Sequence, residues 1–323
     1  MAFLPDTAPM AAYPLPDYAE LHALSNFSFQ RGASHAEELV ERAAGLGYKA
    51  LAITDECSVA GVVRAHEAAK ELGLQLLPGA EFWVAGDSAF RLVVLPHNAA
   101  GWGNLCEFIT AAKQAGEVIE KGSYRVAMGE TDFKLLTDCE ILLSPLPDAI
   151  DTEALCAHTA WAAGLFGIHA WLAVELLQGL DDALRLQQLQ EVGERTGIRL
   201  VAAGNVLMHV RSRKPLHDVM TAIKLGQAVH ECGFALQANA EAHLRPRMRL
   251  SDIYPAGLLR ATLEVAARCS FNLDEIRNLY RYPQDDMVPA GETPAQCLRR
   301  LTAEGATKRY PHGMPDAIRA QVE

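Results

Sequence analysis

The chain has 323 residues, of which 50% are hydrophobic and 21% charged, and its formal net charge is −11. This acidic balance argues against a domain that holds DNA unaided, because Lys and Arg contacts to phosphates supply most of that affinity. The acidic net charge does not exclude a local basic patch, for which Arg211, Arg213 and Lys214 are candidates. No apolar run is long enough to span a membrane, and the N-terminus lacks the basic region of a signal peptide. The seven cysteines form no C-x-x-C pair, which favours a reducing, cytoplasmic compartment and argues against a disulfide framework or a zinc knuckle.

The elements begin after an acidic, proline-containing lead-in at residues 1–17, which we expect to be flexible. Ser34 and Glu37 form a capping-box pattern that opens the first helix. From there, apolar runs alternate with stretches of helical periodicity. The expected strands are 20–24, 49–56, 74–84, 90–95, 140–146, 167–176 and 198–206. The expected helices are 35–47, 59–72, 101–116, 152–163, 181–196 and 215–225.

Seven strand-then-helix units predict an α/β fold with a parallel sheet and crossover helices. Their number and spacing favour a distorted barrel related to the (β/α)₈ type, with an open doubly wound sheet as the alternative. Residues 117–133 are polar and contain glycine, so we expect an irregular excursion there.

The composition changes near Ser270, where proline and glycine cluster and no strand pattern remains. We expect a barrel over 18–270, and a linker followed by the start of another domain over 271–323. A basic helix is predicted from Gln296 onward, and we expect the chain to continue beyond Glu323 in the intact protein.

Polar side chains stand at the ends of several predicted strands, notably His22, Asp55, Glu56, Glu81 and Asn205. A barrel would bring these side chains to one face. Together they suggest the frame of a metal site with oxygen and nitrogen ligands, although a two-metal phosphoesterase centre needs more ligands than these.

Several motifs resemble the PHP (polymerase and histidinol phosphatase) domain of bacterial C-family DNA polymerases. They are ELHALSNFSFQRG, ALAITDECSVAG, LLPGAEF and VLPHNAAGWGNL. Others, namely LSNFSFQRGASHAEELVERA, ITDECS, KGSYR and GNVLMHVRSRK, resemble the error-prone branch of that family. The resemblance covers residues 18–323 and implies a PHP-type barrel followed by the start of a mainly helical polymerase segment.

Active PHP sites of this family carry an H-x-H motif at the first strand and a D-H pair at the second. Here His22 matches, but the second histidine position is Leu24. Asp55 matches, but Glu56 stands in place of the following histidine.

The later ligand positions are depleted as well. Glu81 matches the family's glutamate, whereas the histidine of the fourth strand falls on Arg91. The closing D-x-H motif is replaced by Asn205 and Leu207. Leucine cannot bind a metal and arginine repels one, so the resemblance implies a degenerate, metal-free PHP site.

Structural roles are expected for the residues that remain. His22 is expected to be a hydrogen-bonded histidine, and Asp55 to accept hydrogen bonds from backbone amides or a threonine hydroxyl. We predict that Arg91 forms a salt bridge with Glu56 or Glu81 in place of a metal. The weak candidates for a residual metal ligand are His22, Asp55 and Glu81.

The resemblance implies that the chain is the N-terminal part of an error-prone DNA polymerase acting in translesion synthesis. The catalytic aspartates and their Mg²⁺ ions would then lie outside this segment, with no cofactor inside it. DNA, dNTPs, accessory proteins and a sliding clamp would be partners of the full-length protein, with no membrane contact. A stand-alone metal-dependent phosphoesterase and a non-catalytic interaction module are the alternatives.

Overall fold

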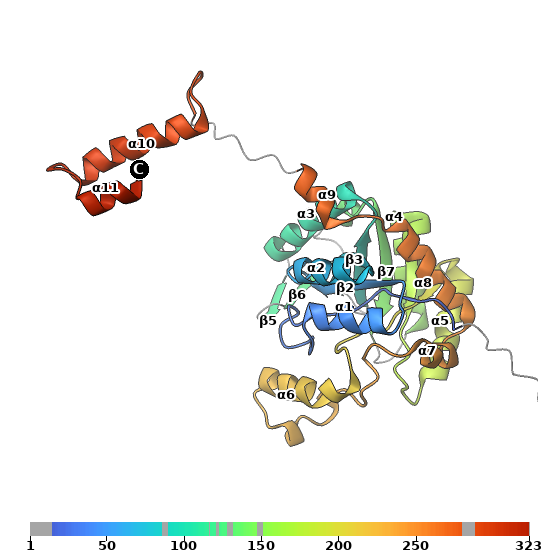
Figure 1. Cartoon of the computed structure of the whole chain (residues 1–323). Helices are drawn as coiled ribbons and strands as arrows, with labels where there is room; N and C mark the ends of the chain where they lie inside the picture. The colour runs from blue at the N-terminus through green and yellow to red at the C-terminus, as the bar shows by residue number, and fades with distance from the viewer. Residues whose placement is uncertain are drawn as a thin grey trace, which may run out of the picture. The chain divides into compact units, whose positions relative to one another are not determined.

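The chain forms two compact units, Met1–Glu275 and Ile276–Glu323, in a computed structural model (Figure 1). The structure describes residues 15–85, 90–115, 117–120, 123–127, 132–146, 151–279 and 288–322. Most of the expected flexible lead-in therefore lies outside the described residues. Each unit is described by itself below.

A curled sheet forms the centre of the first unit. Its strand order is β1-β2-β3-β4-β7-β8-β9. These strands are Ala19–Glu20, Ala50–Glu56, Gln75–Ala85, Phe90–Pro96, Cys139–Pro145, Ala170–Val174 and Arg199–Ala202. A parallel bridge joins Ala23 to Val206, so the segment after β1 meets the segment after β9. The amide of Leu24 donates to the carbonyl of Val206, and the amide of Val206 donates to the carbonyl of His22, each at 2.9 Å. This closure confirms the predicted α/β barrel class.

Strand β4 departs from the expected parallel arrangement, because it runs antiparallel to both β3 and β7. Only four residues, 86–89, separate β3 from β4. A parallel crossover needs about a dozen residues or more, so this connection can only reverse the chain. The reversal places the start of β4 at the carboxyl end of β3 and its end at the opposite edge of the sheet.

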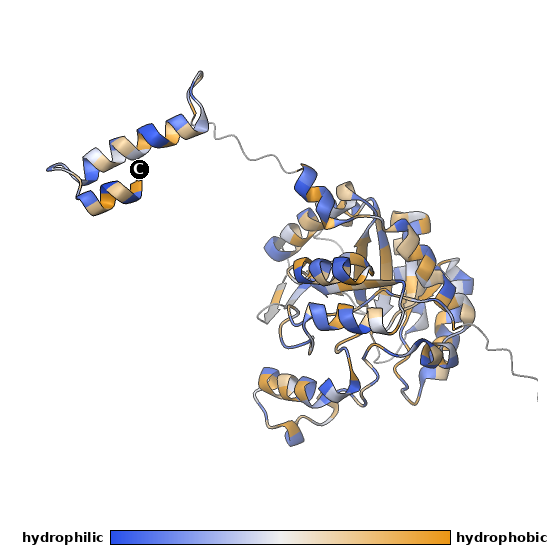
Figure 2. Ribbon diagram, in the orientation of Figure 1, coloured by the Kyte–Doolittle hydropathy of each residue, from blue (hydrophilic) through white to orange (hydrophobic). Residues whose placement is uncertain are grey.

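Helices pack on the outer face of the sheet, and Figure 2 shows hydrophobic strands enclosed by helices with polar outer surfaces. These helices are α1 Ala36–Gly45, α2 Val62–Leu72, α3 Ala99–Ala115, α4 Thr152–Phe166 and α5 Asp182–Thr196. Successive side chains of β2 point to opposite faces of the sheet and therefore belong to two different hydrophobic clusters. Leu51 and Ile53 join the cluster that contains residues of α1 and α2, whereas Ala50 and Ala52 join a second cluster.

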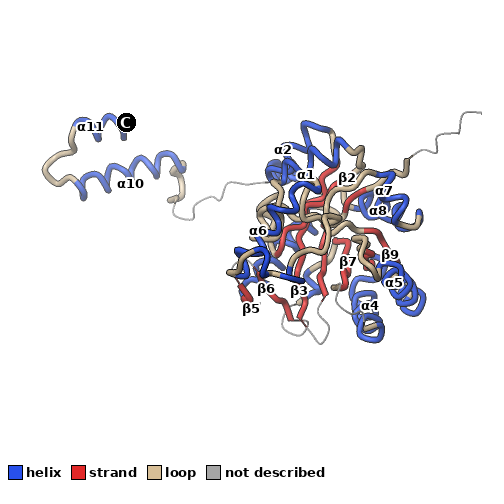
Figure 3. The backbone as a smooth tube through the Cα atoms, turned by 90° about the horizontal axis from the view of Figure 1, so that it is seen from below, coloured by secondary structure: helices blue, strands red, loops and turns tan. Residues whose placement is uncertain are grey.

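Helix α8, Ala256–Arg268, fills that second cluster, and no helix was predicted at its position. Its buried residues Ala261, Val265 and Ala266 belong to the same cluster as Ala50 and Ala52, and the helix packs against β1 and β9. The first unit also contains α6 Lys214–Leu225, as predicted, and a short helix α7 Arg247–Ile253. Figure 3 shows α8 beside α7, on the side of the unit where β9 lies.

Part of the predicted irregular excursion is a hairpin. Strand β5, Glu117–Glu120, pairs antiparallel with β6, Ser123–Ala127. Strand β6 then extends the main sheet by pairing in parallel with β3. The expectation of irregular structure is therefore wrong for these two segments.

The second unit contains α10, Pro294–Arg309, and α11, Asp316–Val322. Thr293 caps α10 by accepting a hydrogen bond from the amide of Gln296, which agrees with a basic helix beginning in this region. Across all the residues that the structure describes, every helix is too short or too polar to cross a membrane.

Candidate functional site

The residues predicted from strand ends gather at one end of the sheet, where the parallel strands finish; we call this the carboxyl edge of the sheet. Glu56 on β2 lies directly opposite Glu81 on β3 in the parallel register. Arg91, near the start of the reversed strand β4, lies opposite Ser144 near the end of β7. The reversal of β4 therefore brings Arg91 to the edge that carries the carboxyl ends of the parallel strands.

His22 bridges two buried carboxylates at this edge. Its Nε2 lies 2.7 Å from Oε2 of Glu81, and its Nδ1 lies 3.0 Å from Oε1 of Glu175. The imidazole and Glu81 are both fully shielded from solvent. Both ring nitrogens are thus engaged with carboxylates, as expected for a hydrogen-bonded histidine.

Arg31 supplies the cation that pairs with Glu56 and Glu81. Its Nη1 donates to Oε2 of Glu56 at 2.6 Å and also to Oε1 of Glu81. The guanidinium lies over the ring of Trp83, 5.5 Å from its centroid. A guanidinium presents several fixed donors, so a single side chain can serve both carboxylates.

Arg91 pairs with Glu175, so the prediction of a partner at Glu56 or Glu81 is wrong. Its Nη2 donates to Oε2 of Glu175 at 2.7 Å and to the hydroxyl of Ser144 at 3.0 Å. The Ser144 hydroxyl in turn donates to Oε1 of Glu175 at 2.6 Å. Arg91 lies beside Ser144 of β7, and Glu175 directly follows β8, which is the next strand of the sheet.

Asp55 accepts hydrogen bonds from the turn that follows β1. The amide and hydroxyl of Ser25 donate to its two oxygens at 2.8 and 2.7 Å, and the hydroxyl of Ser28 donates at 2.7 Å. The Ser28 hydroxyl also accepts from the amide of Glu56 at 3.0 Å. The expected backbone amide is present, and the hydroxyl donors are serines where a threonine was named as the candidate.

The two leucines at the depleted positions lie in one apolar cluster. Leu24 and Leu207 are buried together with Ala33, Met208 and Ala242. Neither leucine side chain offers a donor atom to a metal. Burial of these apolar side chains away from water stabilises the fold at these positions.

Asn205 adopts a positive φ of 43°, in the left-handed region that asparagine tolerates better than most residues. Its Oδ1 is buried without a hydrogen-bond partner among the described residues. The backbone turns at this residue just before the bridge at Val206.

We name six side chains of this edge the polar mouth: His22, Arg31, Glu56, Glu81, Arg91 and Glu175. Burial by itself would raise the pKa of Glu175, but the charge of Arg91 and the hydrogen bond with His22 outweigh it and lower that pKa to about 2. The pKa of Glu81 is likewise lowered, because Arg31 and His22 outweigh its burial. Burial opposes protonation of His22, yet its two carboxylate partners raise its pKa. The mouth is therefore an array of mutually compensating charges.

Comparison with known proteins identifies the family. Residues 20–185 match the family model described as PHP domain. The chain belongs to the PHP domain family. It is 48% identical over 315 residues to the error-prone DNA polymerase of Dechloromonas aromatica, covering 96% of this chain and 29% of that protein. It is 49% identical over 306 residues to the corresponding protein of Methylococcus capsulatus, covering 95% and 28%. The chain thus spans less than a third of the length of these relatives.

Among solved structures, the PHP chain is similar to a putative metal-dependent phosphoesterase from Bifidobacterium adolescentis. The TM-score is 0.43 at 16% identity, and the match covers 59% of this chain and 88% of the other.

Two residues of the polar mouth, Glu175 and Arg31, were not predicted from the sequence. Glu175 directly follows the apolar run AWLAV and had the same strand-end signal that drew attention to Asp55 and Glu81. Arg31 lies in the turn SNFSFQRG, where no periodic pattern indicates which way its side chain points. Cys57 offers no nucleophile beside them, because burial raises the pKa of its thiol to about 12.

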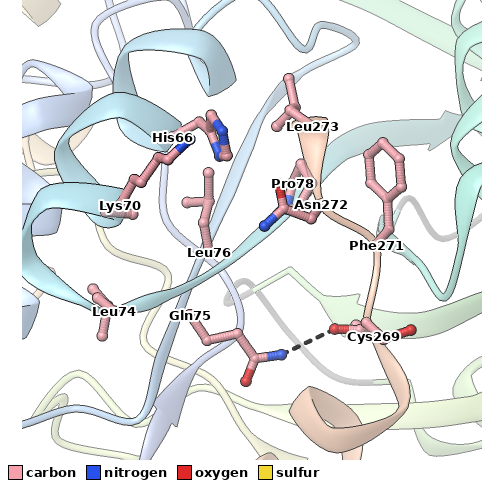
Figure 4. A pocket seen from close by; sticks show the side chains of 12 residues that line it. His66, Lys70, Leu74, Gln75, Leu76, Pro78, Cys269, Phe271, Asn272 and Leu273 are labelled. Carbon is pink, nitrogen blue, oxygen red and sulfur yellow. Dashed lines mark hydrogen bonds between the residues drawn. The ribbon is translucent and has the colours of Figure 1, made fainter. Parts of the chain in front are cut away.

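A separate hollow of about 150 Å³ lies between α2, the start of β3 and the segment after α8 (Figure 4). Gln75 lines this hollow, and its side-chain amide donates to the carbonyls of Ala266 and Cys269, each at 3.0 Å. These carbonyls belong to the last turn of α8 and the residue after it, so Gln75 caps the helix. Gln75 thus ties the C-terminal end of α8 to the start of β3.

Proposed function

We propose that this chain is part of an error-prone C-family DNA polymerase, in which it forms the PHP domain and the start of the following segment. The observation that carries the proposal is identity of 48–49% over at least 95% of the chain to proteins of that name. We propose the N-terminal position with it, and a division between the PHP domain and the following segment that falls after residue 275.

The intact protein would catalyse template-directed nucleotidyl transfer during translesion synthesis in the cytoplasm. Its Mg²⁺-binding aspartates would lie outside this segment. DNA and dNTPs would be its substrates, and polymerase accessory proteins and a sliding clamp its partners. Primer extension across a template lesion by the intact protein tests this, and failure to extend any primed template would contradict it.

Within that polymerase, we propose that the polar mouth of the PHP domain is structural and holds no metal. Arg31 pairs with the carboxylates of Glu56 and Glu81, where a divalent ion would otherwise supply the positive charge. A metal entering there would have to displace a guanidinium and would meet apolar side chains at Leu24 and Leu207. Uncompensated charges in so buried a place are costly, so the salt bridges favour the metal-free arrangement.

Hydrolysis assays on the chain 1–323 test the metal-free role. We expect no cleavage of p-nitrophenyl phosphate or of a mismatched 3′ nucleotide with Mn²⁺, Zn²⁺ or Mg²⁺. Hydrolysis that is lost in an Asp55→Ala variant would contradict the proposal and favour a metal-dependent phosphoesterase. Circular dichroism of the variant would show that the loss does not arise from unfolding.

A further inference from the structure

A second polar cluster lies at the edge of the sheet opposite the polar mouth. Strand β4 runs antiparallel, so His97, which follows its last residue, emerges where β7 begins. Glu140 is the second residue of β7 and pairs with Leu95. His169 immediately precedes β8, whose first residue, Ala170, pairs with Ile141. Three separate segments of the sheet thus converge on one point.

The donor atoms of these three side chains lie within 4.8 Å of one another. Nε2 of His97 and Nδ1 of His169 each lie 2.8 Å from Oε1 of Glu140. Within the described ranges, this is the group of three His, Cys, Asp or Glu ligands compact enough for a single ion. Two histidines and a glutamate form a ligand set that proteins use for Zn²⁺, with a fourth position left for water.

The surroundings hold the three ligands in place. The indole N–H of Trp171 donates to Oε2 of Glu140, which turns Oε1 toward the histidines. The backbone of His97 is fixed at its amide by the carbonyl of Asp138 at 2.8 Å, and at its carbonyl by the amide of Ser270 at 2.9 Å. A hydrogen bond from a neighbouring side chain to a ligating carboxylate, such as that from Trp171 to Glu140, is typical of metal sites.

Access and burial also suit an ion. Glu140 is fully buried, whereas the side chain of His169 is 41% exposed, so an ion can enter from solvent beside that ring. The two imidazoles lie with centroids 4.8 Å apart. Tetrahedral ligands at zinc distances are about 3.3 Å apart. The 2.8 Å contacts must therefore open by about half an ångström, which small rotations of the histidine side chains provide.

Arg268 is the competing cation, with Nη1 at 3.4 Å from Oε1 of Glu140. The same Nη1 donates to the carbonyl of Ile168 at 3.3 Å, and about a third of the side chain is exposed. The guanidinium can thus move away from Glu140 while it keeps a partner, at little cost in desolvation.

We propose that His97, Glu140 and His169 form a site for a divalent transition metal of the Zn²⁺ class, which ties the end of β4 to the starts of β7 and β8. The site is independent of the proposed polymerase function and of the polar mouth. The ion would crosslink three segments of the barrel, and water would fill its fourth position.

Isothermal titration of the chelator-treated protein with Zn²⁺ tests the site. We expect one equivalent to bind, and a higher melting temperature for the loaded protein. His169→Ala should weaken binding by more than about tenfold, because a lost ligand should cost at least as much as a lost hydrogen bond to a ligand. His169 is substantially exposed, so this variant should fold, and the urea midpoint of the metal-free variant checks that. Glu140→Gln provides the second ligand variant.

His66→Ala is the matched control, because His66 also lies 3.3 Å from a carboxylate, that of Asp274, outside the cluster. It should leave Zn²⁺ binding unchanged. Absence of saturable binding at micromolar Zn²⁺, or equal binding by wild type and His169→Ala, would overturn the proposal. Binding that is lost in Glu81→Gln but kept in His169→Ala would place the ion in the polar mouth, which overturns both this proposal and the metal-free mouth.

Discussion

Arg31 connects the turn after β1 to carboxylates on two strands, and the first prediction concerns its removal. Arg31→Met keeps much of the apolar stem but leaves Glu56 and Glu81 without their shared cation. Breaking one side of a buried ion pair costs roughly 3–5 kcal/mol, so we expect a loss of about 3 kcal/mol in the free energy of unfolding. Urea denaturation followed by circular dichroism measures it.

Arg64→Met is the matched control for that change. Arg64 is 58% exposed and lies 3.6 Å from Glu37, so its ion pair is screened by solvent. A surface pair of this kind contributes little, and we expect a change below about 1 kcal/mol. Equal effects of the two substitutions would show that Arg31 does not hold the mouth together.

The pH dependence of stability follows from the opposite shifts of Glu175 and His22. Glu175 faces His22, Arg91 and Ser144, and its pKa falls from 4.5 to about 2, so its contribution is present above about pH 4.5 and is lost as the pH falls toward 2. His22 faces Glu81 and Glu175, and its pKa is raised from 6.5. Its contribution is therefore complete below about pH 6.5 and is lost as the pH rises through the pKa of the folded state.

The two contributions coincide between about pH 4.5 and 6.5, and there we expect the highest urea midpoint. The shift of Glu175 corresponds to a loss on the order of 3 kcal/mol on the acid side. Glu175→Gln should be less stable at neutral pH and should lose less stability on acidification. An acid limb that is unchanged in this variant would assign it to other carboxylates.

At the scale of elements, the turn between β1 and α1 sets the geometry of the mouth, and Gly32 shapes that turn. A Cβ added at Gly32 would lie 2.0 Å from the carbonyl oxygen of Ser25, so the backbone would have to move. Ser25 holds Asp55, and Arg31 is the neighbour of Gly32. We expect Gly32→Ala to destabilise the protein by at least about 2 kcal/mol in thermal or urea unfolding.

Gly103→Ala is the control for that substitution. Gly103 lies within α3, and a Cβ there meets nothing within 4 Å. Alanine is favoured over glycine inside a helix by about 0.5–1 kcal/mol, so this variant should be as stable as wild type or more so. Destabilisation of both variants to the same degree would exclude a steric cause at Gly32.

The sequence predicted most of the elements because their patterns are local. The run ALAITDE identified β2, and helical periodicity predicted α1 to within two residues. The predicted capping box of Ser34 and Glu37 is wrong, because α1 is capped at His35 with Glu38 and the Ser34 hydroxyl contacts His209. Strand direction is not local, so the reversal of β4 was missed even though the short connection at 86–89 implied it. Helix α8 was missed because no strand follows it, and the alternation of strands and helices gave no reason to place it.

The site was predictable to the extent that the strand ends fix it. His22, Asp55, Glu56, Glu81 and Arg91 all lie at one edge, as expected. Which cation meets which carboxylate depends on the curl of the sheet and on the path of a turn, and neither follows from periodicity. Arg31 was therefore missed, and Arg91 was assigned the wrong partners.

At the scale of the whole molecule, the barrel extends its packing beyond α8. Phe271 is 3% exposed and stacks on Trp102 with ring centroids 5.0 Å apart. Lys70 lies 2.8 Å from Asp274 at the start of α9, Leu273–Leu279. These contacts all belong to the first compact unit, which clusters through Glu275. They place residues 269–275 on the barrel, where a boundary at about 270 would assign most of them to the linker.

Two truncations test where the barrel ends. A chain that stops after Leu279 keeps these contacts, and we expect its urea midpoint to match that of the 323-residue chain. A chain that stops after Arg268 loses the buried ring of Phe271 and the carbonyl of Cys269 that Gln75 caps. We expect it to lose about 3 kcal/mol, because truncating a buried aromatic side chain costs roughly that much. Phe271→Ala in the 323-residue chain should reproduce most of the loss. If both truncations were as stable as the longer chain, the packing of this segment would contribute nothing and the boundary would lie at residue 270.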